Sequence, residues 1–361
     1  MADRRGNQWL VRLVDWWRET SVLTLLTSLV LAASALALVI LALGRDPIQS
    51  GALFFRGAFG SETNLIETIL KALPLTLAGL GAAVAFRAGA FNVGIEGQLT
   101  LGALAAAFVG YRAHLPPVIH VVAVLLAGMV AGGLYGFIPG WLKVRRQVNE
   151  IISSIMLNYP AFYFTHWAII RVSGKGSVMP ATPFIDLTAR LPIIIPGTRL
   201  HAGILLAIFL PFVIWYLLER TVLGYELRAV GHGPKAARLA GIRADQRAIL
   251  AMVLSGALAG LAGAVEVAGV HYRLYDQLSP GYGFEAINVA LVALLGPLAV
   301  PFSALFFGAL KTGSTELQAF AKVPRQIGML YQGIILAFIA GQKMVAGWVP
   351  RLRRRTDGAG T

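Results

Sequence analysis

The chain has 361 residues, of which 57% are hydrophobic and only 13% are charged. Soluble globular domains carry about 25% charged residues and about 45–50% apolar ones, so this composition excludes an ordinary soluble protein and indicates an integral membrane protein with many spans. The absence of cysteine excludes disulfides, zinc–thiolate sites and cysteine nucleophiles. The 31 Lys and Arg, against 17 Asp and Glu, lie mostly between apolar runs, which indicates membrane topology rather than nucleic-acid binding.

The amino-terminal residues 1–20 predict an amphipathic helix that lies in the cytoplasmic interface of the membrane and contacts lipid. Arginines lie away from its apolar face, which carries Trp9, Leu13, Trp16 and Trp17.

The first apolar run is longer than the core of a signal peptide, about 7–15 residues, and long enough to cross a bilayer. We therefore expect an uncleaved span. Hydropathy predicts about ten helices of about 20 residues each, and hence an all-α integral membrane fold with a transmembrane permease domain over residues 21–346. The expected spans are residues 21–43, 65–87, 96–111, 117–141, 151–170, 202–219, 248–270, 283–299, 302–319 and 327–346.

Basic residues form four clusters, one before the first span, two between spans and one after the last. With ten spans, all four clusters fall on the same side of the membrane, and the positive-inside rule makes that side cytoplasmic. Both termini are then cytoplasmic, and residues 347–361 form a basic cytoplasmic tail. The clusters lie at residues 4–18, 143–146, 220–247 and 351–355.

Two stretches carry small residues at the spacing that lets membrane helices approach closely. The first places a glycine at every fourth position of one helix, and the second repeats small residues along a later helix. We expect both to be packing surfaces of a compact bundle. They are Gly128, Gly132, Gly136 and Gly140, and then Ser255, Gly256, Ala259, Gly260 and Gly263.

A polar break interrupts the apolar sequence at AFRAGAFNVGIEGQLT, residues 85–100. Glycines there can supply the backbone turns that end one helix and begin the next. Ionisable groups in lipid are costly, so Glu96 should face protein or a water-filled path. One reading of the break is that it shapes a broken helix, and another is that it lines a substrate route. The two readings are compatible. The candidate route residues are Phe91, Asn92, Glu96 and Gln98.

A similar pattern recurs later in the chain. Residues 94–97 read Gly-Ile-Glu-Gly and residues 283–286 read Gly-Phe-Glu-Ala. The expected helices before them, 65–87 and 248–270, point in opposite directions, which is the pattern of an inverted repeat in a transport protein. We therefore expect the second half to contribute Phe284, Glu285 and Asn288 to the same route. The phenylalanines offer faces for a flat ligand, although packing alone also explains them.

The longest polar cytoplasmic segment is residues 220–247, RTVLGYELRAVGHGPKAARLAGIRADQR. It predicts a short helix over 234–240, with proline in its first turn and Gly241 after its end. Its alanines and scarcity of acidic residues favour docking into a groove of another protein, and the alternative is a solvated basic loop.

Three stretches together resemble the permease subunits of bacterial ABC importers, in the nucleoside branch that is related to ribose and branched-chain amino acid permeases. They are FNVGIEGQLTLGA, VNEIISSIMLNY at 148–159 and ELRAVGHGPKAARLAGI at 226–242, and the resemblance runs from about residue 60 to 345. Gly233 stands where many relatives are expected to have Asn. The segment that couples to the ATPase in this family corresponds to Gly224, Arg228, Gly231, Pro234, Ala237, Ala240 and Gly241.

The resemblance implies an importer subunit in the bacterial inner membrane that binds no cofactor. Its implied partners are a second homologous permease, a cytoplasmic ATP-binding subunit and an external substrate-binding lipoprotein. The chain carries no G-x-x-x-x-G-K-[ST] phosphate loop, so any ATPase activity resides in a partner.

Three alternatives stay open. The substrate is a nucleoside on the basis of the resemblance, but a simple sugar such as ribose, or a purine-like or thiamine-like molecule, is also compatible. An ion-coupled secondary carrier needs acids inside the membrane, for which Glu96, Glu266 and Glu285 are candidates. A membrane enzyme is disfavoured because no aspartate falls in an expected span and no H-E-x-x-H metal motif occurs.

Overall fold

A computed structural model describes residues 44–173 and 180–321, with short stretches between 30 and 42 and between 330 and 337. This described part is built of helices, with only isolated β-bridges such as Ala181 to Tyr275. The helices are α3 (Pro47–Phe59), α4 (Glu62–Arg87), α5 (Ile95–Arg112), α6 (Pro117–Arg146), α7 (Glu150–Ser173), η1 (Leu187–Ala189), α8 (Gly203–Arg220), α9 (Val222–His232), α10 (Pro234–Leu239), α11 (Ala244–Val265), η2 (Glu266–His271), α12 (Tyr282–Val292) and α13 (Val300–Ala321).

The chain divides into two compact units, one of residues 1–57 with 313–361 and the other of residues 58–312. Within the first unit, a Cβ atom at Gly313 would lie 2.6 Å from the Phe54 ring, so this position accepts only glycine without rearrangement. The expected interfacial helix over 1–20 and the basic tail lie outside the described residues. The expected spans 21–43 and 327–346 fall mostly outside them.

In the larger unit, α4 is buried almost all round from Ile66 to Ala85. Ser61 caps its start by accepting a hydrogen bond from the Asn64 amide at 3.1 Å. A helix that is apolar on every face belongs at the centre of a bundle. By length and composition, four helical stretches within the described residues can cross a membrane. They are Glu62–Arg87, Pro117–Arg146, Gly203–Arg220 and Ala244–His271.

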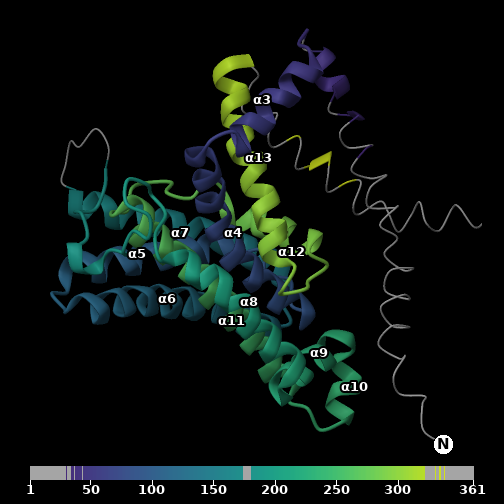
Figure 1. Ribbon diagram of the computed structural model, residues 1–361. Helices are drawn as coiled ribbons and strands as arrows, with labels where there is room; N and C mark the ends of the chain where they lie inside the picture. The colour runs from purple at the N-terminus through teal and green to yellow at the C-terminus, as the bar shows by residue number, and fades with distance from the viewer. Residues whose placement is uncertain are drawn as a thin grey trace, which may run out of the picture. The chain divides into compact units, whose positions relative to one another are not determined.

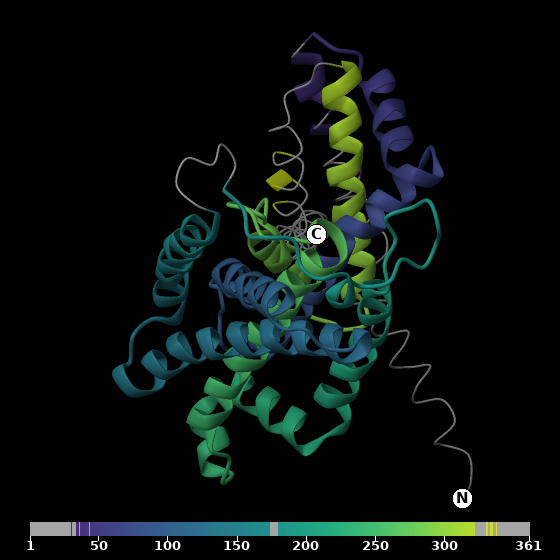
Figure 2. The same cartoon turned by 90° about the vertical axis from the view of Figure 1, so that its left-hand side faces the viewer.

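The predicted small-residue surfaces are confirmed, and they pack against each other. Helices α5, α6 and α11 lie side by side in both ribbon views (Figures 1 and 2). A Cβ atom at Gly128 would lie 2.8 Å from the Gly260 carbonyl oxygen and 3.2 Å from that of Gly102. Three backbones therefore meet where only glycine leaves enough room.

Most expected spans inside the described part are confirmed as helices, but the span predicted over 283–299 is wrong. Helix α12 ends at Val292, and Leu294 and Leu295 then adopt left-handed backbone conformations. Its 11 residues extend about 16 Å, roughly half the thickness of the hydrocarbon core. Gly296 and Pro297, directly after this turn, are a helix-ending signal that the continuous hydropathy of residues 283–299 outweighed in the prediction.

The segment 220–247, which we expect to be cytoplasmic, contains two helices instead of the single one expected. Helix α10 begins at Pro234 as predicted, and Gly241 follows its end with a φ of +81°. The Gly241 and Ile242 amides donate to Arg238 and Ala237, which is the usual glycine-terminated end of a helix. Helix α9 was not expected, because Gly224 and Gly231 within it disfavour a helix and the segment reads as a polar loop between spans.

Candidate functional site

The polar break lies between α4 and α5, and a dense set of hydrogen bonds holds it in place. Gly89, with a φ of +68°, ends α4, and the Gly89 and Ala90 amides donate back to the last turn of the helix. The fully buried Asn92 side chain donates to Gln98 at 2.7 Å and to Ser255 of α11 at 2.9 Å. Its carbonyl oxygen accepts from the Gly94 amide and from Gln98. Asn92 and Gln98 therefore satisfy each other inside the protein.

Helices α6 and α7 fix the break from the other side. The Asn158 amide group accepts from the Gly97 amide at 2.8 Å and donates to the Val93 carbonyl at 3.2 Å. Lys143, at the end of α6, donates to the Gly89 carbonyl and pairs with Glu150. Nearly every polar group of this irregular segment thus has a protein partner, as non-helical backbone at membrane depth requires.

Glu96 joins the two segments that the sequence presents as repeats. It lies in the first turn of α5, and its carboxylate accepts a hydrogen bond from the Gly283 amide at the start of α12, at 2.5 Å. The Ser279 hydroxyl also bonds to this carboxylate. An acidic group is stabilised at the amino terminus of a helix, so Glu96 serves both α5 and α12.

Glu285, one turn into α12, forms a buried ion pair with Lys311 of α13. The Lys311 ammonium lies 2.8 Å from both carboxylate oxygens and 4.9 Å from the centre of the Tyr282 ring. The third candidate acid, Glu266, lies 3.3 Å from the His271 ring nitrogen in η2. All three acids that an ion-coupled carrier would use are therefore already paired with groups of this chain.

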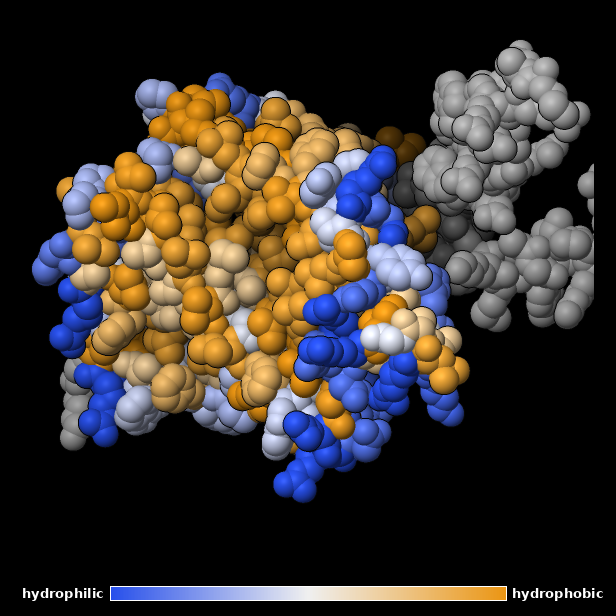
Figure 3. All heavy atoms as spheres, turned by 90° about the horizontal axis from the view of Figure 1, so that it is seen from below, coloured by the Kyte–Doolittle hydropathy of each residue, from blue (hydrophilic) through white to orange (hydrophobic). Residues whose placement is uncertain are grey.

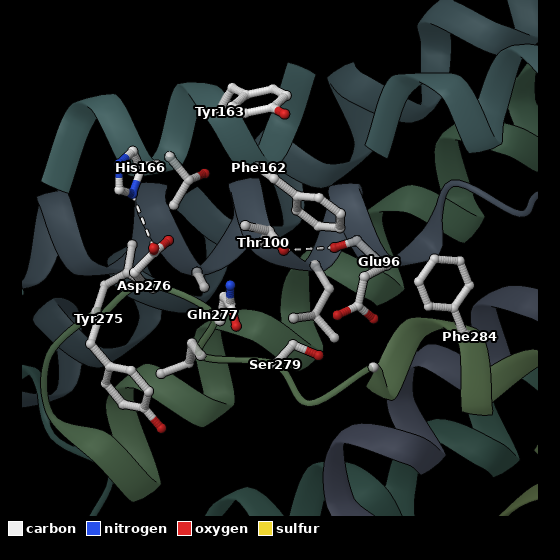
Figure 4. Close-up of a pocket in the computed structure, with 16 residues that line it drawn as sticks. Glu96, Thr100, Phe162, Tyr163, His166, Tyr275, Asp276, Gln277, Ser279 and Phe284 are labelled. Carbon is white, nitrogen blue, oxygen red and sulfur yellow. Dashed lines mark hydrogen bonds and ion pairs between the residues drawn. The ribbon is translucent and has the colours of Figure 1, made fainter. Parts of the chain in front are cut away.

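A cavity of about 500 Å³ opens beside Glu96 (Figure 4). Helix α5 forms one wall and α7 a second, and the segment 274–281 with Phe284 forms a third. The His166 and Asp276 side chains, 3.0 Å apart, lie at one end of it, and Phe284 lies at the other. The lining residues are Glu96, Leu99, Thr100, Ala103, Phe162, Tyr163, Thr165, His166, Leu274, Tyr275, Asp276, Gln277, Leu278, Ser279, Gly281 and Phe284.

The polar groups of the cavity are uncharged apart from Glu96 and the pair at its end. Burial raises the pKa of the Tyr275 phenol, so this group stays protonated and able to donate a hydrogen bond. Its oxygen lies 3.4 Å from His271. The cavity is therefore suited to a neutral ligand with both polar and apolar parts.

Of the seven residues predicted to line a route, Glu96 and Phe284 line this cavity and the others do not. Asn92 and Gln98 are buried in the network that supports the break. Phe91 is 47% exposed, with its ring centre 5.0 Å from that of Phe86. Glu285 lies in its ion pair, and Asn288 is half-buried on α12.

Sequence reasoning missed the α7 and loop residues of the cavity. Thr165 and His166 were available as polar positions in an apolar helix. Asp276 gave no comparable signal, because it reaches His166 only through a fold that brings together positions 110 residues apart.

The predicted coupling segment contacts the break directly. Gly231 of α9 packs on the carbonyl of Arg87, and a Cβ atom at Gly89 would lie 3.1 Å from the Gly231 Cα atom. Arg87 of α4 and Arg228 of α9 both pair with Glu219 of α8. A displacement of α9 would therefore act on the last turn of α4 and on the break that follows it.

Helix α10 presents a different surface from the one expected. Ala237 is only 4% exposed and packs with Val230 and Ala244 in the core of this turn, and its coupling role stays a prediction. Ala240 is exposed, and the neighbouring Leu239 is 92% exposed. In the view from the end where α9 and α10 lie, hydrophilic side chains gather on their side, and a broad hydrophobic surface extends away from them (Figure 3).

The remaining predicted coupling residues have structural roles within the chain. Gly224 packs on the end of α8, where a Cβ atom would overlap Leu218. Pro234 begins α10 and Gly241 ends it. Gly233 has extended backbone and nothing within 3.8 Å of a Cβ position, so it accepts a larger residue.

Comparison with known proteins places these features in a family. Residues 64–340 match the model of the branched-chain amino acid transport system permease component. The guanosine ABC transporter permease NupP of Bacillus subtilis is 34% identical over 94% of this chain and 98% of its own length. The glucose permease TsgB13 of Haloferax volcanii is 34% identical, covering 89% and 86%. The nucleoside permease NupB of Lactococcus lactis is 32% identical, covering 88% and 90%. No solved structure gives a significant match.

Proposed function

The chain belongs to the branched-chain amino acid transport permease family, and from that premise we propose that it is the permease subunit of an ATP-driven ABC importer of nucleosides. Relatives of similar length are named as guanosine and nucleoside permeases. The chain itself supplies the membrane path, and a partner supplies the ATPase.

One structural observation carries the mechanism. The cytoplasmic helix α9 packs on the end of α4 at Gly231, and the break that follows α4 leads to Glu96 at the cavity wall. Because the break is held by hydrogen bonds throughout, movement of α9 is transmitted to Glu96 and the start of α12. ATP-driven movement at the cytoplasmic side would thereby alter the cavity.

The proposal includes the membrane arrangement and the partners. The chain lies in the inner membrane of a bacterium as a multi-span protein with both termini in the cytoplasm, on the evidence of its basic clusters. A second homologous permease completes the path, and a binding lipoprotein delivers the substrate from outside. The inverted repeat remains part of this proposal, supported by the close packing of α4 on α11 at Gly81 and Ser255.

A sugar importer is the runner-up, because the relative named as a glucose permease is as similar as the guanosine permease. The phenylalanines of the cavity favour the nucleoside, since a base has flat apolar faces and a simple sugar does not. An ion-coupled carrier is disfavoured, because Glu96, Glu266 and Glu285 are each committed to partners.

The test replaces the exposed leucine of α10. In Leu239→Asp we expect the ATPase subunit to co-purify about tenfold less or worse, since a hydrophobic anchor of an interface contributes roughly 2 kcal/mol or more. ATP-dependent nucleoside uptake should fall with it, while the Tm in detergent stays unchanged. The matched control for co-purification is Leu187→Asp, because Leu187 is also exposed, at 78%, but lies in η1.

Normal ATPase recovery and uptake in Leu239→Asp would overturn the docking role of α10. If the purified wild-type chain moved solute alone along an ion gradient in liposomes, the importer proposal itself would fall.

A further inference from the structure

The cavity beside Glu96 has two chemically different ends. His166, Asp276 and Tyr275 lie together at one end, and the Phe162 and Phe284 rings lie toward the other (Figure 4). Hydroxyl and carboxylate groups suit a polyhydroxylated ligand, whereas aromatic faces suit a flat ring system. A nucleoside joins these two parts in a single molecule.

Thr165 supplies a specific polar group in the wall of this cavity. Its side chain is 3% exposed and lines the cavity, and its hydroxyl has no hydrogen-bond partner within the described part of the chain. Three other threonines within helices behave differently. Thr76, Thr100 and Thr312 each donate to the carbonyl four residues earlier, at 2.8, 2.8 and 3.0 Å.

An unpaired buried hydroxyl is costly, and a ligand group that pairs with it recovers that cost. Thr165 directly precedes His166 in α7 and both residues line the cavity, so we assign its hydroxyl to the polar end. Phe162 precedes it by one helical turn on the same face of α7, which places an aromatic ring next to the hydroxyl along the cavity wall.

We propose that the cavity binds a nucleoside in one orientation, with the base toward Phe162 and Phe284 and a sugar hydroxyl hydrogen-bonded to Thr165. Asp276 and His166 border the sugar, and because their contact joins Nδ1 to Oδ2, the Oδ1 and Nε2 atoms are left to face a ligand at that end. The proposal rests on the nucleoside function given above and adds which residue reads the sugar.

The experiment measures whether Thr165 and a sugar hydroxyl act together. The complete transporter, with its ATPase and binding protein, is reconstituted in proteoliposomes, and ATP-dependent uptake is measured for guanosine and for its 2′-, 3′- and 5′-deoxy analogues. Uptake of each of these four compounds is measured with the wild-type chain and with the Thr165→Val variant. Because the binding protein is the same throughout, its own preference cancels in the ratio of the two proteins.

One of the three analogues lacks the hydroxyl that bonds to Thr165. In wild type we expect its uptake efficiency to be about 5- to 20-fold lower than that of guanosine, and in Thr165→Val we expect this difference to disappear. In Thr165→Val, guanosine uptake should fall to the level of that analogue. The matched control is Thr100→Val, which lines the same cavity but whose hydroxyl is already bonded within α5. The Thr100→Val variant should keep the wild-type preference for guanosine over the analogue.

Two results would overturn the proposal. One is an equal loss for guanosine and all three analogues in Thr165→Val, which is the behaviour of a packing residue. The other is the same change in Thr100→Val. If wild type carried no nucleoside but did carry glucose, the nucleoside function would fail, and that outcome is read from wild type alone.

Discussion

The two irregular segments that precede α5 and α12 differ in how they are held. Residues 88–94 are largely buried, and side chains of α6, α7 and α11 bond to them or to their neighbours. Residues 272–281 include exposed positions such as Asp276 and Gln277, and most of them line the cavity. They lead into α12, whose Gly283 amide donates to the Glu96 carboxylate at the start of α5.

This difference indicates a division of labour. The first segment is a rigid connection between helix α9 and the cavity wall, because its polar groups are paired in several directions. The second segment lines the cavity, and we propose that it contacts the ligand. Apparent repeats in sequence thus serve different purposes, one for support and one for recognition.

The largest expected effect comes from breaking the network of the first segment with Asn92→Leu. This change keeps the approximate volume but leaves the buried Gln98 side chain and the Gly94 amide without their partner. We expect a loss of about 3 kcal/mol in the free energy of unfolding, since each unpaired buried group costs about 1–3 kcal/mol. Thermal unfolding in detergent measures it.

Asn288→Leu is the matched control. Asn288 is half-buried on α12, and its side chain makes no hydrogen bond with the described residues. The Tm of Asn288→Leu should stay close to that of wild type. Equal losses in the two variants would remove the contrast between a supporting segment and a recognising one.

These two segments also show what the sequence predicts well. The break at 85–100 was recognisable because glycines, amides and an acid inside an apolar run are local signals, and Asn92 and Gln98 proved to be structural members of it. Proline and glycine likewise marked the start and end of α10. The spans were predictable because hydropathy is a property of each segment by itself.

Features that depend on packing between distant segments were not predictable. Ala237 reads as a surface alanine until α9 and α11 fold over it. Helix α12 is short because Leu294 and Leu295 turn left-handed, which leucine itself does not indicate; only Gly296 and Pro297 after them mark the place. Thr165 and Asp276 become one end of a cavity only in the assembled bundle.

The second-largest expected effect comes from a change at Gly231, where α9 contacts the first segment. In Gly231→Ala the new methyl group would overlap the Arg87 carbonyl, so we expect a cost of about 2 kcal/mol and a displacement of α9. ATP hydrolysis by the complex should then proceed with reduced nucleoside uptake. Gly233→Ala, two residues away in open space, should leave both unchanged. Wild-type coupling in Gly231→Ala would contradict the rigid connection.

A smaller effect is expected where the two segments join. Glu96→Ala removes the acceptor of the Gly283 amide and should cost about 1–2 kcal/mol, whereas Glu96→Gln keeps an acceptor and loses about 0.5 kcal/mol of helix-dipole stabilisation. Hydrogen exchange gives the sharper readout. Deuterium uptake should rise in residues 272–284 of Glu96→Ala and stay low in residues 88–94. A rise in both segments would mean that they open as one unit.

The smallest effect concerns the backbone of the second segment itself. Gln277 has a φ of +55°, a conformation that costs a non-glycine residue roughly 1–2 kcal/mol and that glycine adopts freely. Allowing for the greater chain entropy of glycine, Gln277→Gly should raise the free energy of unfolding by about 0.5 kcal/mol. Gln246→Gly, an exposed position in α11, should instead lower it by roughly 1 kcal/mol. Changes of opposite sign in the free energy of unfolding of the two variants, obtained from their melting curves, support a left-handed turn at Gln277 beside the cavity. A loss of stability in both variants would mean that the second segment has a different backbone, and with it a different cavity wall.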